Sequence, residues 1–477
     1  MAQIHELTMI ELAAAIRAGE LSPVAVTDHY LRRTTELNDQ VGAFYTITPE
    51  FAADQAREAE KAVAAADDPA DLPPLTGVPI PIKDLNMVAG VRQTLGSKAF
   101  EANVPDTDDY VVVNIKQAGA VITGKTATPE FGLPCYTEPD GRPPAVTPWD
   151  PTRSAGGSSG GAAAAVAAGI TPLAHASDGG GSIRIPASAC GLVGLKVSRG
   201  LISSGARPPG PGLGTDGVVS RTVRDTALAL DVLAGPQPGD TYSAPVDRDG
   251  YLSACDRPVG RLRVGVLTTP VIAADADVHP ACLDAVTRAT QLLEGLGHDL
   301  VEAPAAFPAE RWQVFRAVWS VGALSIPLPP EADPALTPLT RWLRDGGRQV
   351  SGLEYASAVA AMQALTREVA ETWAEFDVIL SPTLAQPPAL VGSLRDDADP
   401  ASDFDAQTRF TPWTSVFNLT GRPAISLPLH TARVGGADAP ELPIGVMLGG
   451  RFGAESMLLG LAAALEASAP WGHPALG

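Results

Sequence analysis

Residues 156–186 read GGSSGGAAAAVAAGITPLAHASDGGGSIRIP, so that two glycine–serine turns enclose an alanine-rich run. The first turn has the small residues that permit a tight bend and a close approach of two backbone segments. The alanines that follow permit a helix packed hard against a sheet. A flexible linker is disfavoured by that helix, and a phosphate-binding loop by the absence of a following Gly-Lys-Ser or Gly-Lys-Thr. This stretch therefore predicts a helix on a sheet, with a serine turn on either side.

Apolar strand patterns alternate with helical patterns on both sides of this stretch. The strand patterns lie at residues 78–82, 120–125, 262–267, 378–380, 424–427 and 444–448, and the helical ones at 8–37, 52–66, 280–295 and 353–375. Such alternation predicts an α/β fold, a single large domain whose central mixed sheet is covered by helices on both faces. Along the chain we expect a helical N-terminal region over residues 1–74, packed on an α/β core over residues 75–477.

The composition excludes several classes of protein. Of the 477 residues, 45% are hydrophobic and 18% charged, which allows a large buried core and excludes global disorder. The net charge of −20 argues against nucleic acid as a partner, because acidic chains repel phosphate backbones. The four cysteines form no CxxC pair, so neither a disulfide framework nor a metal site is expected, and a cytoplasmic setting fits best. Neither a signal peptide nor a membrane-spanning helix is expected.

Lys83 directly follows the apolar stretch 78–82 and is one of only six lysines in the chain. Burial would lower the pKa of its ammonium group and supply a neutral amine as a base. The alternative is a lysine that reaches water or pairs with the neighbouring Asp84. No histidine joins the serine motifs, and His175 is expected to be a packed core residue. A nucleophilic serine in this chain would therefore need another proton acceptor, and Lys83 is the candidate.

Ser182 follows three glycines and is the first candidate nucleophile. The unshielded N–H groups of Gly179, Gly180 and Gly181 can converge on an oxyanion beside its hydroxyl group. The alternative for this motif is an ordinary glycine turn with an unreactive serine.

A different serine would be the nucleophile in an α/β-hydrolase esterase. Residues 157–161 fit the G-x-S-x-G pattern, which would give that role to Ser159. The pattern requires an apolar strand in front of it, and residues 149–154 instead predict a turn. The esterase remains the alternative from another enzyme class.

Taken together, these motifs resemble the amidase signature family. The resemblance runs from about residue 6 to residue 470 and rests on these segments: Lys83-Asp84, Gly124-Lys125-Thr126, Glu130-Phe131-Gly132, 156–161, 177–186, 190–196, Ser381-Pro382-Thr383, 417–424 and Pro443-Ile444-Gly445. Residues 177–181 and 184–188 are similar to the branch of bacterial amidases of the 6-aminohexanoate cyclic-dimer hydrolase type. The amidotransferase subunits of the family usually have Thr-Asp-Thr-Gly-Gly where this chain has Ser177 to Gly181.

The resemblance implies a serine amidohydrolase with a Lys-Ser-Ser triad. Lys83 would be the base, Ser158 the proton relay, and Ser182 the nucleophile that forms an acyl-enzyme. A non-proline cis peptide in front of Ser158 is also implied, and no metal or organic cofactor is. Three further residues are expected to hold the lysine, the relay and the glycine loop in place: Ser159, Asp178 and Arg184.

Loop residues and an aromatic stripe are the candidates for a substrate pocket. They are Phe131, Gly132, Leu133, Pro134, Cys135, the loop Arg207 to Leu213, and Trp312, Phe315 and Trp319. The stripe has helical spacing, so the sequence alone favours a plain core face for it. The expected partner is a small-molecule amide, carbamate or aryl ester. An amidotransferase subunit that acts only with partner chains is a further alternative, and a homodimer is one alternative for the assembly.

Overall fold

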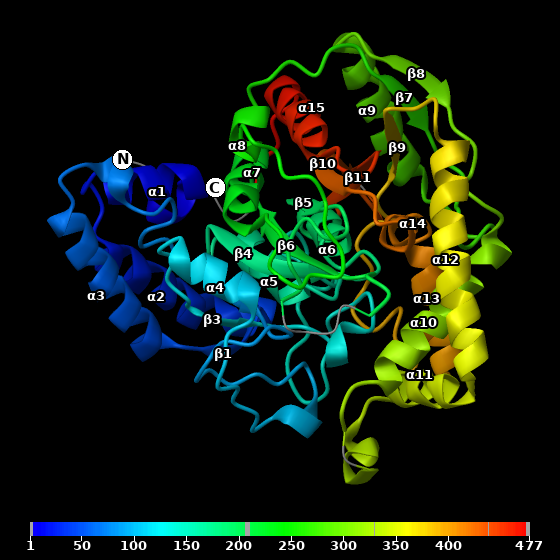
Figure 1. The fold of residues 1–477 in the computed structure, drawn as a ribbon, viewed down its shortest axis with the longest axis horizontal. Coiled ribbons are helices and arrows are strands. Elements are labelled where there is room, and N and C mark those ends of the chain that lie inside the picture. The colour runs from blue at the N-terminus through cyan, green and yellow to red at the C-terminus, as the bar shows by residue number, and fades with distance from the viewer. Residues whose placement is uncertain (1–2, 206–209, 329, 437, 474–477) are drawn as a thin grey trace.

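An eight-stranded mixed sheet forms the centre of the computed structural model, which describes residues 3–205, 210–328, 330–436 and 438–473 (Figure 1). Its strands lie in the order β4 (Leu173–Asp178), β6 (Thr215–Ser220), β5 (Val193–Lys196), β10 (Ala424–Arg433), β11 (Glu441–Gly450), β9 (Val378–Pro382), β7 (Arg263–Val266) and β8 (Asp299–Glu302). β7 runs parallel to β8 and β9, and the other neighbouring strands are antiparallel. The predicted mixed sheet is confirmed.

A second, three-stranded sheet positions Lys83. It has the order β1 (Phe44–Ile47), β3 (Gly124–Thr126) and β2 (Ile82–Lys83). The prediction of a strand over 78–82 is wrong, since only its last residue is in β2 and a single bridge from Pro79 to Val121 precedes it. Pro79 and Pro81 lack the N–H groups that a regular ladder requires, which confines the strand to the residues after them.

Helices cover both faces of the large sheet, as predicted. The α-helices are α1 (Met9–Arg17), α2 (Pro23–Val41), α3 (Pro49–Ala65), α4 (Tyr110–Gln117), α5 (Gly160–Ala167), α6 (Arg184–Cys190), α7 (Val223–Leu233), α8 (Tyr251–Ala254), α9 (Pro280–Gly295), α10 (Gln313–Leu324), α11 (Pro338–Gln349), α12 (Gly352–Thr372), α13 (Pro400–Phe410), α14 (Thr414–Thr420) and α15 (Glu455–Ser468). Short 3-10 helices are η1 (Ile4–Glu6), η2 (Pro69–Asp71), η3 (Lys98–Phe100), η4 (Glu130–Gly132), η5 (Ala309–Trp312) and η6 (Pro330–Ala335).

The core consists of two layers that share the sheet, because side chains along a strand alternate between its faces. In β9, Val378 and Leu380 belong to the cluster that includes α7, α9 and α15, whereas Ile379 belongs to the cluster that includes α10, α12 and α14. α5 is alanine-rich and fully buried, and it packs on the end of the sheet formed by β4 and β6, whereas its neighbour α6 packs on β5, β10 and β11. Helices α10 to α13 thus gather at one side of the molecule (Figure 1).

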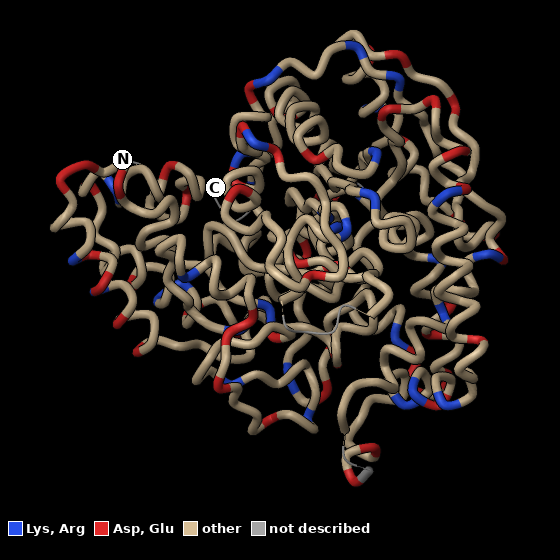
Figure 2. Tube along the Cα trace, viewed as in Figure 1, with Lys and Arg blue, Asp and Glu red and all other residues tan. Residues whose placement is uncertain are grey.

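Local signals fix the N-terminal helices. Thr8 and Glu11 form a capping box at the start of α1, and Ser22 caps α2 with Pro23 in the first turn. This segment also supplies β1, which pairs with β3. Acidic residues are spread along these helices and around the outer rim, with basic residues between them (Figure 2). Over the described ranges, no helix is both long and apolar enough to cross a bilayer.

Candidate active site

Lys83 and Ser158 meet in the interior. β2 carries Lys83 beneath β4, and its Nζ donates to the Oγ of Ser158 at 2.8 Å. The same ammonium group donates to the carbonyl of Ser177 at 3.2 Å and lies 3.1 Å from the hydroxyl of that residue. Lys83 is fully buried and Ser158 nearly so. The structure therefore joins two of the predicted triad residues and adds Ser177, which the sequence had not singled out.

Burial lowers the pKa of Lys83 to about 7, and the carboxylates of Asp178 and Asp216 act against that shift. The neighbouring Asp84 does not pair with Lys83. It points the other way, where its Oδ1 accepts from Lys125 at 2.9 Å and its Oδ2 accepts from the backbone of Thr94 at 2.9 Å. The alternatives of a surface lysine and of a Lys83–Asp84 pair are therefore both wrong.

The Gly157–Ser158 peptide bond is cis, in the position that the family resemblance implied. A side chain at Gly157 would lie 2.8 Å from the backbone of Tyr136, so only glycine fits there. α5 begins two residues after Ser158 and directs the first glycine–serine turn toward Lys83.

Ser182 lies in the turn between β4 and α6, and its side chain is largely buried. Gly181 has a φ of +139°, and a Cβ atom there would lie 2.6 Å from Ile185 and Thr414. The expectation for its N–H is wrong, because that group donates to Asp178 Oδ1 at 2.8 Å and is not free for an oxyanion. Within the described ranges, no protein acceptor engages the N–H groups of Gly179, Gly180 or Ser182.

Asp178 and Arg184 form a buried pair behind the glycine loop. Arg184 donates from Nε to Asp178 Oδ2 at 2.9 Å and from Nη2 to Oδ1 at 3.0 Å, and both side chains are fully buried. Asn418 links the pair, since it donates to Asp178 Oδ1 and accepts from Arg184. Burial alone would raise the pKa of Asp178, but Arg184 and Asn418 hold it well below its usual range. Asp178 therefore stays ionised and fixes the loop through Gly181.

We expect Asp178→Asn to lower the free energy of unfolding by about 3–5 kcal/mol, because it leaves Arg184 as a buried charge without its partner. Urea denaturation followed by circular dichroism would measure the change. Asp256→Asn is the matched control, since Asp256 pairs with Arg224 at the surface. A loss of stability no larger than that of the control would contradict a structural role for the buried pair.

Ser159 and His175 lie close to the site but do not form an esterase triad. Ser159 donates to the carbonyl of Ser177 at 3.2 Å and accepts from its N–H at 3.3 Å, so its hydroxyl supports the strand that contacts Lys83. His175 accepts from the backbone N–H of Lys83 at 3.3 Å, and its Nε2 lies 3.3 Å from Asp216. The histidine thus faces Lys83 and Asp216 and not the Ser159 hydroxyl.

Two cavities meet at Ser182. The first encloses about 460 Å³, partly open to solvent, and its wall includes Ser182, Ile185 and residues of α10 and α13. The second encloses about 860 Å³ and is lined by both Ser158 and Ser182, together with Ser177. Trp319 belongs to both walls. Of the two cavities, only the second is lined by Ser158, so a group bound in the second cavity lies next to the predicted proton relay and a group in the first does not.

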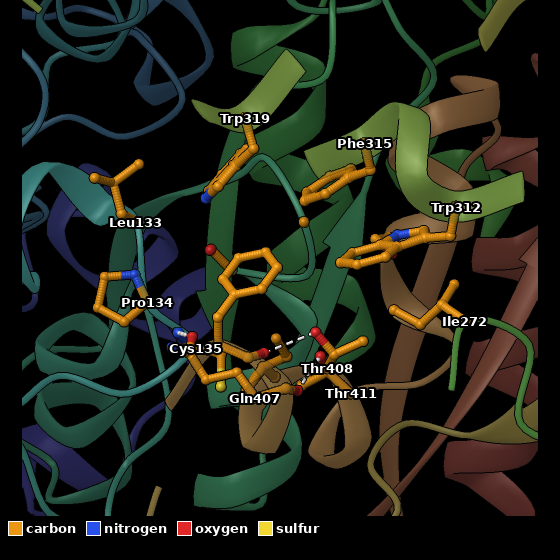
Figure 3. A pocket seen from close by; sticks show the side chains of 15 residues that line it. Leu133, Pro134, Cys135, Ile272, Trp312, Phe315, Trp319, Gln407, Thr408 and Thr411 are labelled. Atoms are coloured by element: carbon orange, nitrogen blue, oxygen red, sulfur yellow. Dashed lines mark hydrogen bonds between the residues drawn. The ribbon is translucent and has the colours of Figure 1, made fainter. Parts of the chain in front are cut away.

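An aromatic stripe forms one side of the first cavity (Figure 3). Trp312 stacks on Phe315 with ring centroids 5.0 Å apart, and Phe315 stacks on Trp319 at 5.1 Å. The prediction of a core face holds for Trp312 and Phe315, which are buried in the core with Trp319 packed against them, and the same rings also line the cavity.

The remaining pocket candidates are divided between the cavities. Leu133, Pro134 and Cys135 line the first, and Phe131 and Gly132 line the second. Arg207 lies outside the described residues. Helices α13 and α14 and two loops contribute further residues to the first cavity that no sequence pattern predicted: Ile272, Phe404, Gln407, Thr408, Thr411 and Ser415. Asn418 was not predicted as a site residue either, although it lies in segment 417–424, one of those on which the family resemblance rests. Over the described ranges, no cluster of three or more metal-binding side chains is found.

Comparison with known proteins gives concordant matches. The family model described as Amidase matches residues 25–459. The 6-aminohexanoate-cyclic-dimer hydrolase of Paenarthrobacter ureafaciens is 34% identical over 96% of this chain and 94% of its own. An acylamidase of Rhodococcus erythropolis is 31% identical over 98% and 96%. A solved structure of 6-aminohexanoate cyclic dimer hydrolase superimposes with a TM-score of 0.90 and 31% identity, covering 100% of both chains.

Proposed function

The chain belongs to the amidase family, and from this premise we propose that it is a serine amidohydrolase that cleaves small amides through an acyl-enzyme on Ser182. The observation that carries the proposal is the 2.8 Å contact between Lys83 Nζ and Ser158 Oγ in a fully buried setting. A lysine whose pKa is lowered to about 7 is half neutral near that pH and can then accept a proton.

The reaction proceeds in two halves. The Oγ of Ser182 attacks the carbonyl carbon while its proton passes to Ser158, whose own proton passes to Lys83. The N–H groups of Gly179, Gly180 and Ser182 are the donors available to the oxyanion. Collapse of the tetrahedral intermediate breaks the C–N bond, and the proton returns through Ser158 to the leaving nitrogen. Water then attacks the acyl-enzyme by the same proton route, which releases the acid and restores the serine.

The position of Ser158 supports an assignment of the two cavities to the two halves of the substrate. Because the relay must hand its proton to the leaving nitrogen, the amine departs on the side that Ser158 lines, which is the second cavity. The acyl group therefore occupies the first cavity, beside the aromatic stripe. Aryl carbamates and aryl esters present the same carbonyl to Ser182 and are further substrates.

We expect neutral acyl groups with an apolar body to be preferred. None of the described residues that line the first cavity is acidic or basic, and burial raises the pKa of Cys135 far above neutrality. Phenylacetyl para-nitroanilide should exceed succinyl para-nitroanilide in kcat/KM by at least about 100-fold, since a carboxylate buried without a partner costs several kcal/mol. Release of nitroaniline measures both rates. Equal rates would contradict the assignment of the acyl cavity.

An aryl carbamate provides the direct test of the covalent step, because carbamoyl-enzymes hydrolyse slowly. Incubation should add one carbamoyl group to the intact mass, and peptide mapping should place that group on Ser182. A carbamoyl group on Ser159, with none on Ser182, would instead support the alternative of an esterase with Ser159 as its nucleophile.

A further inference from the structure

The acyl cavity has a polar floor opposite its aromatic wall (Figure 3). Helix α13 and the residue after it bring Gln407, Thr408 and Thr411 to this floor. Ser182 lies elsewhere on the same cavity wall, so an acyl group bound to it can reach these side chains with its far end. The polar side chains of the floor can therefore influence which acyl groups the cavity binds.

Both threonine hydroxyls have already used their only proton. Thr408 Oγ1 donates to the carbonyl of Phe404 at 2.8 Å, and Thr411 Oγ1 donates to the carbonyl of Gln407 at 2.9 Å. A hydroxyl group has one donor and two acceptor sites. No group in the described ranges donates to either oxygen, so each threonine presents only acceptor capacity to the cavity.

Gln407 is locked in one orientation and holds the floor in place. Its Oε1 accepts from the N–H of Cys135 at 2.8 Å, and its Nε2 donates to Asp403 Oδ1 at 2.5 Å. Asp403 also accepts from the hydroxyl of Tyr136 at 2.7 Å and is buried beneath the floor. Because these contacts fix α13 to the segment around residue 135, the two threonine oxygens have a defined position.

Besides the proposed nucleophile Ser182, Ser415 also has a hydroxyl proton available in this cavity. Its Oγ accepts from the indole N–H of Trp312 at 2.9 Å, and no contact of its own proton is found in the described ranges. Ser415 can therefore donate a hydrogen bond to a ligand, whereas the threonines can only accept one from a ligand. The two possibilities can be separated by ligand chemistry.

We infer that the cavity selects acyl groups that carry a neutral hydrogen-bond donor, a hydroxyl or an N–H, beyond an apolar body, and that Thr408 and Thr411 recognise this donor. The inference rests on the proposed function, since it assigns the acyl group to this cavity. The two threonine oxygens, one buried and one half-buried, can only accept, so they discriminate against a ligand that covers them without a donor, because they then lose water without gaining a partner.

Three matched substrates test the inference on the unmodified enzyme: the para-nitroanilides of para-hydroxyphenylacetic, para-methoxyphenylacetic and para-tolylacetic acid. The hydroxyl compound should exceed the tolyl compound in kcat/KM by about tenfold or more, and the methoxy compound should not. A hydroxyl preference shared by the methoxy compound would mean that Ser415 supplies the contact and would overturn the inference. Equal rates for the hydroxyl and tolyl compounds would also overturn it.

Thr408→Val and Thr411→Val replace each hydroxyl with a methyl group of similar size. The double variant should bring the hydroxyl-to-tolyl ratio of kcat/KM to within about twofold of one. Thr287→Val is the matched control, because Thr287 makes the same contact to a carbonyl one turn earlier but lies on α9. An unchanged ratio in the folded double variant would refute the role of the threonines.

The failure of this inference can be distinguished from failure of the proposed function. If turnover of all three anilides survives Ser182→Ala, the acyl-enzyme itself is wrong. If turnover depends on Ser182 but shows no donor preference, only the donor recognition is wrong.

Discussion

Replacing Ser182 with alanine should lower kcat/KM for phenylacetyl para-nitroanilide by about 10⁵-fold or more, because no acyl-enzyme can then form. The variant should fold normally, since the side-chain hydroxyl of Ser182 holds no other part of the described chain. Initial rates of nitroaniline release, measured with a thermal melt of the same preparation, would establish both points.

Ser159→Ala is the control for this result. Its hydroxyl is fully buried and bonded to the backbone of Ser177, so its loss should reduce the rate without removing turnover. Full activity in a folded Ser182→Ala protein would refute the nucleophile. If Ser159→Ala lost turnover and Ser182→Ala kept it, Ser159 would be the nucleophile and Ser182 would not.

The second large effect concerns Lys83. Its pKa of about 7 lies far below the ordinary value of about 10.4, so the amine becomes neutral as the pH rises through about 7. Activity should therefore rise on a single limb centred near that pH and reach a plateau on the alkaline side. Lys83→Met cannot accept a proton, and we expect it to lose at least about 10³-fold in kcat/KM together with the limb.

Lys196→Met is the matched control for the pH profile. Lys196 is also fully buried, its pKa is also lowered to about 7 by burial, and its Nζ donates to the carbonyl of Val197. It lines neither cavity, so its variant should keep the limb. If Lys196→Met removed the limb and Lys83→Met kept it, the base would be misassigned.

The parts of the fold that could be predicted from the sequence are those with strong local signals. The capping box at Thr8 and Glu11 places α1, and the helical pattern over 280–295 has the bounds of α9. Strands β4, β5 and β6 were missed because their alanine, glycine and serine residues give little apolar signal. They are strands because α5 and α6 pack closely on them, which is a tertiary effect.

The candidate site divides in the same way. Lys83 and Ser182 could be chosen from their own neighbourhoods, since a lysine after an apolar stretch and a serine after three glycines are both unusual. The hydrogen bond from the Gly181 N–H to Asp178 could not be predicted from the sequence, because it depends on how Arg184 and Asn418 orient the Asp178 carboxylate. The floor of the acyl cavity gave no signal, since its threonines are ordinary helical residues until α13 is placed against the segment around residue 135.

The proposed triad and the wall of the proposed acyl cavity come from largely different parts of the chain. Lys83, Ser158 and Ser182 lie on β2, before α5 and before α6, whereas the aromatic stripe and the polar floor lie on α10, on α13 and in the turns beside them. Under the proposed function, a lineage can therefore change which acids it releases by substitutions in a separate set of helices, while the proposed triad stays unchanged. Mutant libraries confined to that set would vary substrate range in variants that keep the same reactive centre.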